Sequence, residues 1–303
     1  MEYEDNFNPC MNRIDDMKET GLKTVDVNGT QLHYMMFGDN NKQSVIFTPA
    51  AFTDYRVWQF QVEPLSRHYR VITYSRRHSY PNKAEDNFHF TEENSGIHQY
   101  ASDLAELIRK LNLAPVHLVG HSDGGFVTLY CACKSPSLVK SLVLGEPAVL
   151  PVLAASQVEE DRKMFQNFWE NAIKPAAEAF GRGEFENGTR MFMDGAMSKG
   201  YFDQLPQPIR QSMMANAKAF LKQAENPMPM DFNLQELKQI SSVPTLFVKG
   251  EHSPKFLHRI VDILAQHLPK SEQVTIPEVT HDLGRATKAE VFNSKVMEFL
   301  ARN

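Results

Sequence analysis

Residues 116–126 of this 303-residue chain read Val116-His117-Leu118-Val119-Gly120-His121-Ser122-Asp123-Gly124-Gly125-Phe126. The first four residues form a short run that is typical of a buried strand, and a helix-like pattern follows Gly125. Between them lies Gly-x-Ser-x-Gly, the pattern of a very tight turn from a strand into a helix. Gly120 and Gly124 leave room for the strand and the helix to approach, so we expect Ser122 to be exposed in a strained backbone conformation. The alternative is a glycine-rich turn with an ordinary surface serine.

Short apolar runs alternate with helical patterns on both sides of this turn. We expect strands at residues 24–27, 31–37, 44–48, 71–74, 116–119, 139–144, 243–248 and 273–276. We expect helices at residues 55–66, 94–113, 124–134, 254–268 and 288–301. The pattern predicts an α/β fold, with a mostly parallel central sheet that helices cover on both faces.

One interval breaks this alternation. From about residue 150 to 235 the chain has helical stretches rich in Met, Phe and Ala, and no strand-like run. We therefore expect an α/β core built from residues 1–149 and 236–303, with residues 150–235 inserted as a helical cap, or lid. Residues 1–22 are polar and are expected to precede the core as an N-terminal extension.

Composition argues against several classes of protein. The net charge is −5, and Lys and Arg do not cluster with aromatic residues, so we expect no nucleic-acid partner. No apolar run is long enough for a membrane span, and the first residues do not resemble a signal peptide, so we expect a cytoplasmic protein. Three cysteines cannot form a disulfide framework, and Cys131 and Cys133 are expected to be buried free thiols rather than metal ligands.

Serine needs a base within hydrogen-bonding reach to act as a nucleophile. The chain has eleven histidines, and His281 lies between the last expected strand and the last expected helix. Loops after the carboxyl ends of parallel strands line one crevice, so His281 and Ser122 can meet there. We expect His121 to pack or bond locally. The histidines expected on solvated hairpin or helix surfaces are His33, His68, His89, His258 and His267.

The order of elements resembles the α/β-hydrolase fold family over nearly the whole chain after residue 22. The matching pieces are residues 120–125, the late His281, the helical insertion, and residues 57–66 and 69–79. The resemblance implies hydrolysis through an acyl-enzyme: Ser122 attacks, His281 transfers the proton, and water then releases the acid. It implies no metal and no organic cofactor.

The chain departs from the family in the loop that binds the oxyanion. The usual His-Gly pair after the third strand is replaced by Pro49-Ala50, counting back from Trp58. The family's donor in this loop is a backbone N–H, which Ala51 retains. The second donor implied by the resemblance is the backbone N–H of Asp123.

The second departure concerns the acidic member of the triad. Many relatives have Asp in the loop after the seventh strand, where this chain has Ser253. Serine cannot balance the charge of an imidazolium. Some family members place the acid after the sixth strand, where this chain has Glu146. Glu146 is therefore the predicted acid, and Glu251 and Asp282 are the alternatives.

The expected cap is rich in apolar side chains that suit an adaptable pocket above Ser122. The candidates are Phe165, Phe168, Trp169, Met191, Phe192, Met193, Met197, Met213 and Met214. Such residues usually bury the core of their own helices, so we expect about one in three of them to line the pocket. The loop residues Tyr74, Arg76, Arg77 and His78 are candidates for its rim, with ordinary surface charge as the alternative for the two arginines.

We therefore expect a serine hydrolase that acts on a small, fairly apolar ester or lactone. Two alternatives remain. The same three residues can cleave a C–C bond or an amide or act as a perhydrolase, and some proteins of this fold are non-catalytic receptors or scaffolds. The expected partner is a small-molecule substrate, and the sequence makes no prediction of oligomeric state.

Overall fold

The computed structural model describes residues 21–38, 43–82, 96–224, 232–284 and 288–303. The predicted N-terminal extension lies almost entirely outside these residues. No helix within the described ranges combines the length and the apolar character that a bilayer-spanning helix needs.

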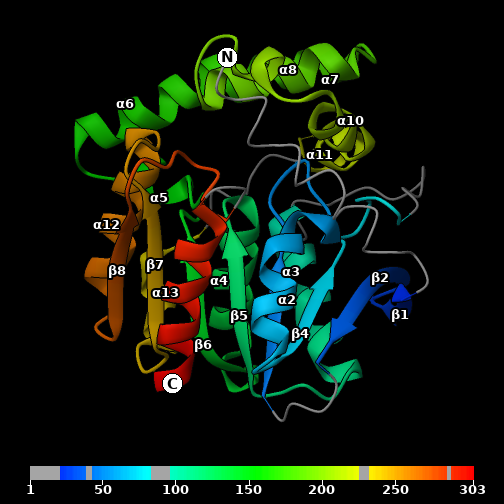
Figure 1. Cartoon of the computed structure of the whole chain (residues 1–303). Helices are drawn as coiled ribbons and strands as arrows, with labels where there is room; N and C mark the ends of the chain where they lie inside the picture. The colour runs from blue at the N-terminus through cyan, green and yellow to red at the C-terminus, as the bar shows by residue number, and fades with distance from the viewer. Residues whose placement is uncertain (1–20, 39–42, 83–95, 225–231, 285–287) are drawn as a thin grey trace.

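Eight strands form one sheet, in the order β1-β2-β4-β3-β5-β6-β7-β8 (Figure 1). They are β1 (Lys23–Val27), β2 (Thr30–Phe37), β3 (Ser44–Thr48), β4 (Arg70–Tyr74), β5 (Val116–His121), β6 (Val139–Gly145), β7 (Thr245–Gly250) and β8 (Ser271–Ile276). Strands β3 to β8 run parallel, and β2 pairs antiparallel with both β1 and β4. The predicted α/β fold with a mostly parallel sheet is confirmed.

Helices cover both faces of this sheet, which is why its central strands are apolar on both sides. The helices of one face are α3 (Gly96–Lys110), α4 (Asp123–Lys134) and α12 (Lys255–His267), and those of the other are α2 (Gln59–Ser66) and α13 (Ala289–Arg302). The one-turn helix η2 (Tyr55–Trp58) precedes α2, and η3 (Pro136–Leu138) precedes β6. All five residues of β3 are buried, as this position between two layers of helices requires.

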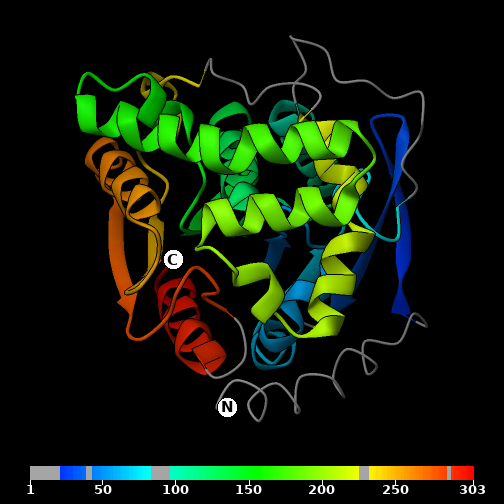
Figure 2. The same ribbon diagram turned by 90° about the horizontal axis from the view of Figure 1, so that it is seen from above.

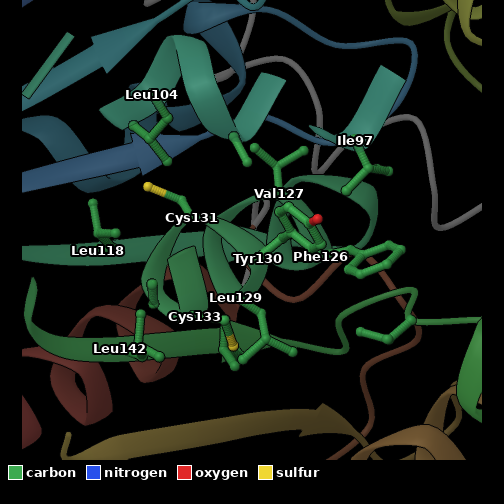
Figure 3. Close-up of a cluster of buried hydrophobic side chains, with 14 of the residues drawn as sticks. Ile97, Leu104, Leu118, Phe126, Val127, Leu129, Tyr130, Cys131, Cys133 and Leu142 are labelled. Carbon is green, nitrogen blue, oxygen red and sulfur yellow. The ribbon is translucent and has the colours of Figure 1, made fainter. Parts of the chain in front are cut away.

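Helix α4 is deeply buried, packed between α3 and the strands β5 and β6 (Figure 3). Eleven of its twelve residues are buried. They include Cys131 and Cys133, which are free thiols as expected. Burial raises the pKa of both thiols to about 12, so they are protonated at neutral pH and chemically inert.

Between β6 and β7 the described chain contains only helices and loops. The helices are α5 (Pro151–Ala154), α6 (Glu159–Phe168), the π-helical η4 (Trp169–Ile173), α7 (Lys174–Gly181), α8 (Phe185–Ala196), α9 (Tyr201–Gln204), α10 (Gln207–Ala215), α11 (Ala217–Ala224) and η5 (Leu234–Ile240). Helices α6, α7, α8, α10 and α11 extend across the edge where the parallel strands end (Figure 1), and Figure 2 shows them from above. The division of the chain into a core and a functional cap stays a prediction.

Candidate active site

Ser122 occupies the turn between β5 and α4, in a conformation that L-amino acids rarely adopt, with φ 54° and ψ −124°. The two glycines of the motif make this turn possible. A Cβ atom on Gly120 would lie 2.5 Å from the Gly124 carbonyl oxygen, and one on Gly124 would lie 2.3 Å from the Pro49 carbonyl oxygen. Any side chain at these positions would push α4 away from β5 or from the loop after β3.

Backbone hydrogen bonds fasten Ser122 to the end of the neighbouring strand β6. The Ser122 N–H donates to the Gly145 carbonyl at 2.9 Å, and the Ser122 carbonyl accepts from the Ala148 N–H at 2.9 Å. The loop after β6 is thereby held beside the serine. Because parallel strands end at one edge of a sheet, this loop and the loop after β8 meet there.

Glu146, in the loop after β6, meets His281, in the loop after β8. The His281 Nδ1 lies 2.6 Å from the Glu146 Oε2, and the carboxylate is fully buried. Glu146 has φ 42°, a second strained backbone position at this edge. Both His281 and Ser122 line the same cavity. The structure therefore joins Glu146 to His281 and places His281 and Ser122 on one cavity. The catalytic roles of the three residues are a proposal.

The loop after β7 holds the carboxylate of Glu146 in place. The Gly250 N–H donates to Oε1 at 2.8 Å, and the Ser253 hydroxyl donates to Oε2 at 2.9 Å. Ser253, at the position where the resemblance leads one to expect an Asp, is here a donor to Glu146. Three donors, counting His281, thus satisfy a charge that would be costly to bury without partners.

His258, on α12, was expected to be a solvated surface histidine, and this prediction is wrong. Its Nε2 donates to the Gly250 carbonyl at 2.7 Å and lies 3.5 Å from the Glu146 Oε1. Its side chain is 29% exposed. No motif marks His258, because its place beside Glu146 follows only from the packing of α12 against the end of β7.

The two alternative acids have other partners. The Glu251 carboxylate accepts from the Glu278 N–H at 2.8 Å, and its side chain is half exposed. The Asp282 carboxylate accepts from the Tyr201 hydroxyl of α9 at 2.5 Å, which ties the loop of His281 to the helices above. His121 behaves as expected: its Nε2 donates to the backbone carbonyl of His281 at 2.7 Å.

Arg76 and Arg77 are buried, with 4% and 2% of their surface exposed, so neither is ordinary surface charge. The Arg76 guanidinium lies 2.5 Å from the Asp123 carboxylate and donates to the Ala50 carbonyl at 3.0 Å. Burial acts to lower the pKa of Arg76, but Asp123 and Tyr100 offset it and hold that pKa above its usual value. The neighbouring Arg77 forms two bonds with Asp103, both at 2.9 Å. The rim prediction also fails for Tyr74 and His78, which are buried and do not line the cavity with Ser122.

The cavity over Ser122 is mostly apolar and encloses about 830 Å³, part of it open to solvent. The core supplies Ala50, Ala51, Phe52 and Thr53 from the loop after β3. Of the apolar candidates, the residues that line it are Phe168, Phe192, Met193, Met197 and Met213, a larger share than expected. Phe52, Phe192 and Phe220 form one aromatic cluster, with ring centroids 4.5 to 5.2 Å apart, that joins the core loop to the helices above it.

The strained turn at Ser122, the buried carboxylate–imidazole pair and the apolar cavity beside them are the features of this site. The family model described as alpha/beta hydrolase fold matches residues 43–284, and the chain belongs to this family. Among curated relatives, the serine hydrolase BPHL of Mus musculus is 27% identical, over 91% of this chain and 85% of that protein. The 3-oxoadipate enol-lactonase 1 of Acinetobacter baylyi is 25% identical, over 84% of this chain and 87% of that protein.

Solved structures agree on the fold. The enol-lactonase from Burkholderia xenovorans superposes with a TM-score of 0.71, at 21% identity, and the match covers 92% of this chain and all of that one. The carboxylesterase CesB from Bacillus subtilis has a TM-score of 0.68 at 17% identity, with 99% of both chains covered. The relatives are hydrolases, which supports hydrolase activity for this chain.

Proposed function

We propose that the protein is a serine hydrolase that cleaves a small, fairly apolar ester or lactone through an acyl-enzyme. The observation that carries this proposal is the 2.6 Å contact between the His281 Nδ1 and the buried Glu146 carboxylate, at the edge of the sheet where Ser122 occupies its strained turn. The apolar lining of the cavity favours an uncharged, apolar substrate.

In this mechanism the Ser122 Oγ attacks the ester carbonyl carbon and its proton passes to the His281 Nε2. The carbonyl π electrons move to oxygen, and the backbone N–H groups of Ala51 and Asp123 bind the resulting oxyanion. When the C–O bond breaks, His281 protonates the leaving alcohol. Water then repeats the attack on the acyl-enzyme, releases the acid and returns the proton to Ser122. Glu146 keeps the Nδ1 proton in place and stabilises the imidazolium in both steps.

The helices above the cavity act as a lid that selects the substrate. They supply Phe192, Met193 and Met197 to the same cavity as Ser122, and unbranched methionines adapt to different shapes. A small-molecule substrate, action without a cofactor and a cytoplasmic location belong to the same proposal.

The test is turnover of p-nitrophenyl esters of graded chain length, combined with labelling by a fluorophosphonate and mass mapping of the adduct. We expect the protein to hydrolyse these esters, and we expect a single covalent adduct on Ser122 to abolish the hydrolysis. Ser122→Ala should lose about a thousandfold or more in kcat and keep its folded circular dichroism spectrum. A folded Ser122→Ala protein with near-normal turnover, or a wild type that neither turns over nor labels, would overturn the proposal. The second of these results would favour a receptor or scaffold.

A further inference from the structure

The geometry points to Arg76 as a positioning residue that holds both backbone donors of the oxyanion hole, and this inference rests on the proposed function. One guanidinium reaches both sides of that hole. Its Nη1 lies 2.5 Å from the carboxylate of Asp123, whose own N–H is one proposed donor. Its Nη2 donates at 3.0 Å to the carbonyl of Ala50.

The Ala50 carbonyl belongs to the same peptide group as the Ala51 N–H, which is the other proposed donor. In a trans peptide the C=O and the N–H point in opposite directions, so a donor fixed on the carbonyl side also fixes where the N–H points. A cation bonded to the carbonyl further polarises the amide and makes its N–H a stronger donor. Arg76 can therefore act on the Ala51 N–H without touching the substrate.

The Thr53 hydroxyl supports the same peptide, since it donates to the Ala50 carbonyl at 2.8 Å. These contacts lie in the loop where the chain has Pro49-Ala50 in place of the family's His-Gly pair. Phe52, next along the loop, has φ 58°, so the backbone turns sharply after the donor peptide. We infer that Arg76 and Thr53 give this altered loop the order that the hole needs.

Charge gives a second reason for the same role. Asp123 lines the cavity directly after Ser122, and an unpaired carboxylate there would repel a developing oxyanion. Arg76 cancels that charge from the buried side, and its guanidinium also lies 4.8 Å from the centre of the Tyr100 ring. A buried ion pair adds little net stability over a well-packed apolar pair, so stability alone does not account for this one.

The neighbouring Arg77 provides a matched control. It is also buried, its Nη2 lies 2.9 Å from the Asp103 carboxylate, and it donates to the Asn28 carbonyl at 3.0 Å. Arg77 is not among the residues that line the cavity with Ser122. Arg77→Gln therefore reports the cost of losing a buried ion pair, while Arg76→Gln reports that cost together with any effect on the hole.

The decisive measurement compares two inhibitors of the same shape. An aryl trifluoromethyl ketone adds Ser122 to its carbonyl carbon and places an oxyanion in the hole, whereas the matching methyl ketone binds essentially without addition. The inhibition constant of the methyl ketone divided by that of the trifluoromethyl ketone isolates oxyanion binding. For Arg76→Gln we expect this ratio and kcat to fall about 10- to 100-fold, less than the loss of a donor outright, with KM and methyl-ketone binding within about threefold.

Arg77→Gln should lower the denaturation midpoint and leave the inhibitor ratio unchanged. Arg76→Lys keeps the charge beside Asp123 but loses the guanidinium group that contacts Asp123 and the Ala50 carbonyl at the same time. It should therefore fold and still show the reduced ratio. If Arg76→Gln does not fold, the inhibitor ratio of Arg76→Lys tests the role of Arg76. If folded Arg76→Gln or Arg76→Lys has the same inhibitor ratio as the wild type, the inference is overturned. The proposed function still stands in that case, provided that the wild-type protein turns over esters. If the wild type neither hydrolyses esters nor labels at Ser122, the proposed function itself fails.

Discussion

Replacing Glu146 by Gln tests the most unusual feature of the site, an acid that follows β6. The substitution keeps the shape of the side chain and removes its charge. The fully buried carboxylate lies 2.6 Å from the His281 Nδ1, so no water can take over its role. An amide in this place either presents an NH₂ group to the Nδ1–H or lets the ring adopt the other tautomer, in which Nε2 carries the proton and cannot accept one from Ser122.

The expected loss can be estimated from these contacts. A hydrogen bond to a charged group contributes about 1.5–3 kcal/mol, and the imidazolium that forms during acyl transfer also loses its counter-charge. Together these effects predict a loss in kcat of about a thousandfold or more, which corresponds to about 4 kcal/mol. The assay is kcat for a p-nitrophenyl ester, with the midpoint of chemical denaturation measured on the same samples.

The matched controls are Glu251→Gln and Asp282→Asn, whose carboxylates accept from Glu278 N–H and from the Tyr201 hydroxyl. Both should cost much less in kcat than Glu146→Gln. A folded Glu146→Gln protein that keeps kcat within about tenfold of the wild type would refute the reasoning. A thousandfold loss in Asp282→Asn instead would move the acid to that residue.

Three further predictions follow from other parts of the structure. His281→Gln should slow fluorophosphonate labelling of Ser122 as strongly as it slows turnover, and an unchanged labelling rate would mean that another group activates the serine. Burial, and to a lesser extent Lys140, lowers the pKa of His117 to about 4, so between about pH 6.5 and 4 the unfolded chain binds a proton that the folded chain does not. His117 should therefore lower the free energy of unfolding by about 2 kcal/mol from pH 7 to 5, and His117→Gln should remove that contribution. Met193→Ala should change the relative kcat/KM for short and long acyl chains more than it changes the denaturation midpoint, and equal losses for all chain lengths would argue against its place in the acyl pocket.

The fold was predictable because its signals are local. Continuous apolar runs of four to eight residues separated by helical periodicity specify buried parallel strands, and the eight expected strands all occur in the structure. The turn at Ser122 was equally predictable. Glycine is required at positions 120 and 124 because a Cβ atom there would meet residues a few positions away in the chain or at the end of one neighbouring strand.

Some errors came from residues whose signals are not local. An arginine pair in a loop looks like surface charge. The carboxylates of Asp123 and Asp103, which the fold brings within hydrogen-bonding distance, balance the charges of Arg76 and Arg77 and so favour their burial. His258 has no motif because its partners, the Gly250 carbonyl and the Glu146 carboxylate, come from two strand ends.

The sequence by itself therefore determined the sheet, the turn that exposes Ser122 and the short set of candidates for base and acid, because strand edges and tight turns depend on neighbours in the chain. The tertiary structure decided which carboxylate faces His281, what holds that carboxylate, and where Arg76 points. These depend on distances between residues such as Glu146 and His281, which are 135 positions apart in the chain and 2.6 Å apart at the contact. Only the pairing of β6, β7 and β8 in one parallel sheet brings the ends of those strands together.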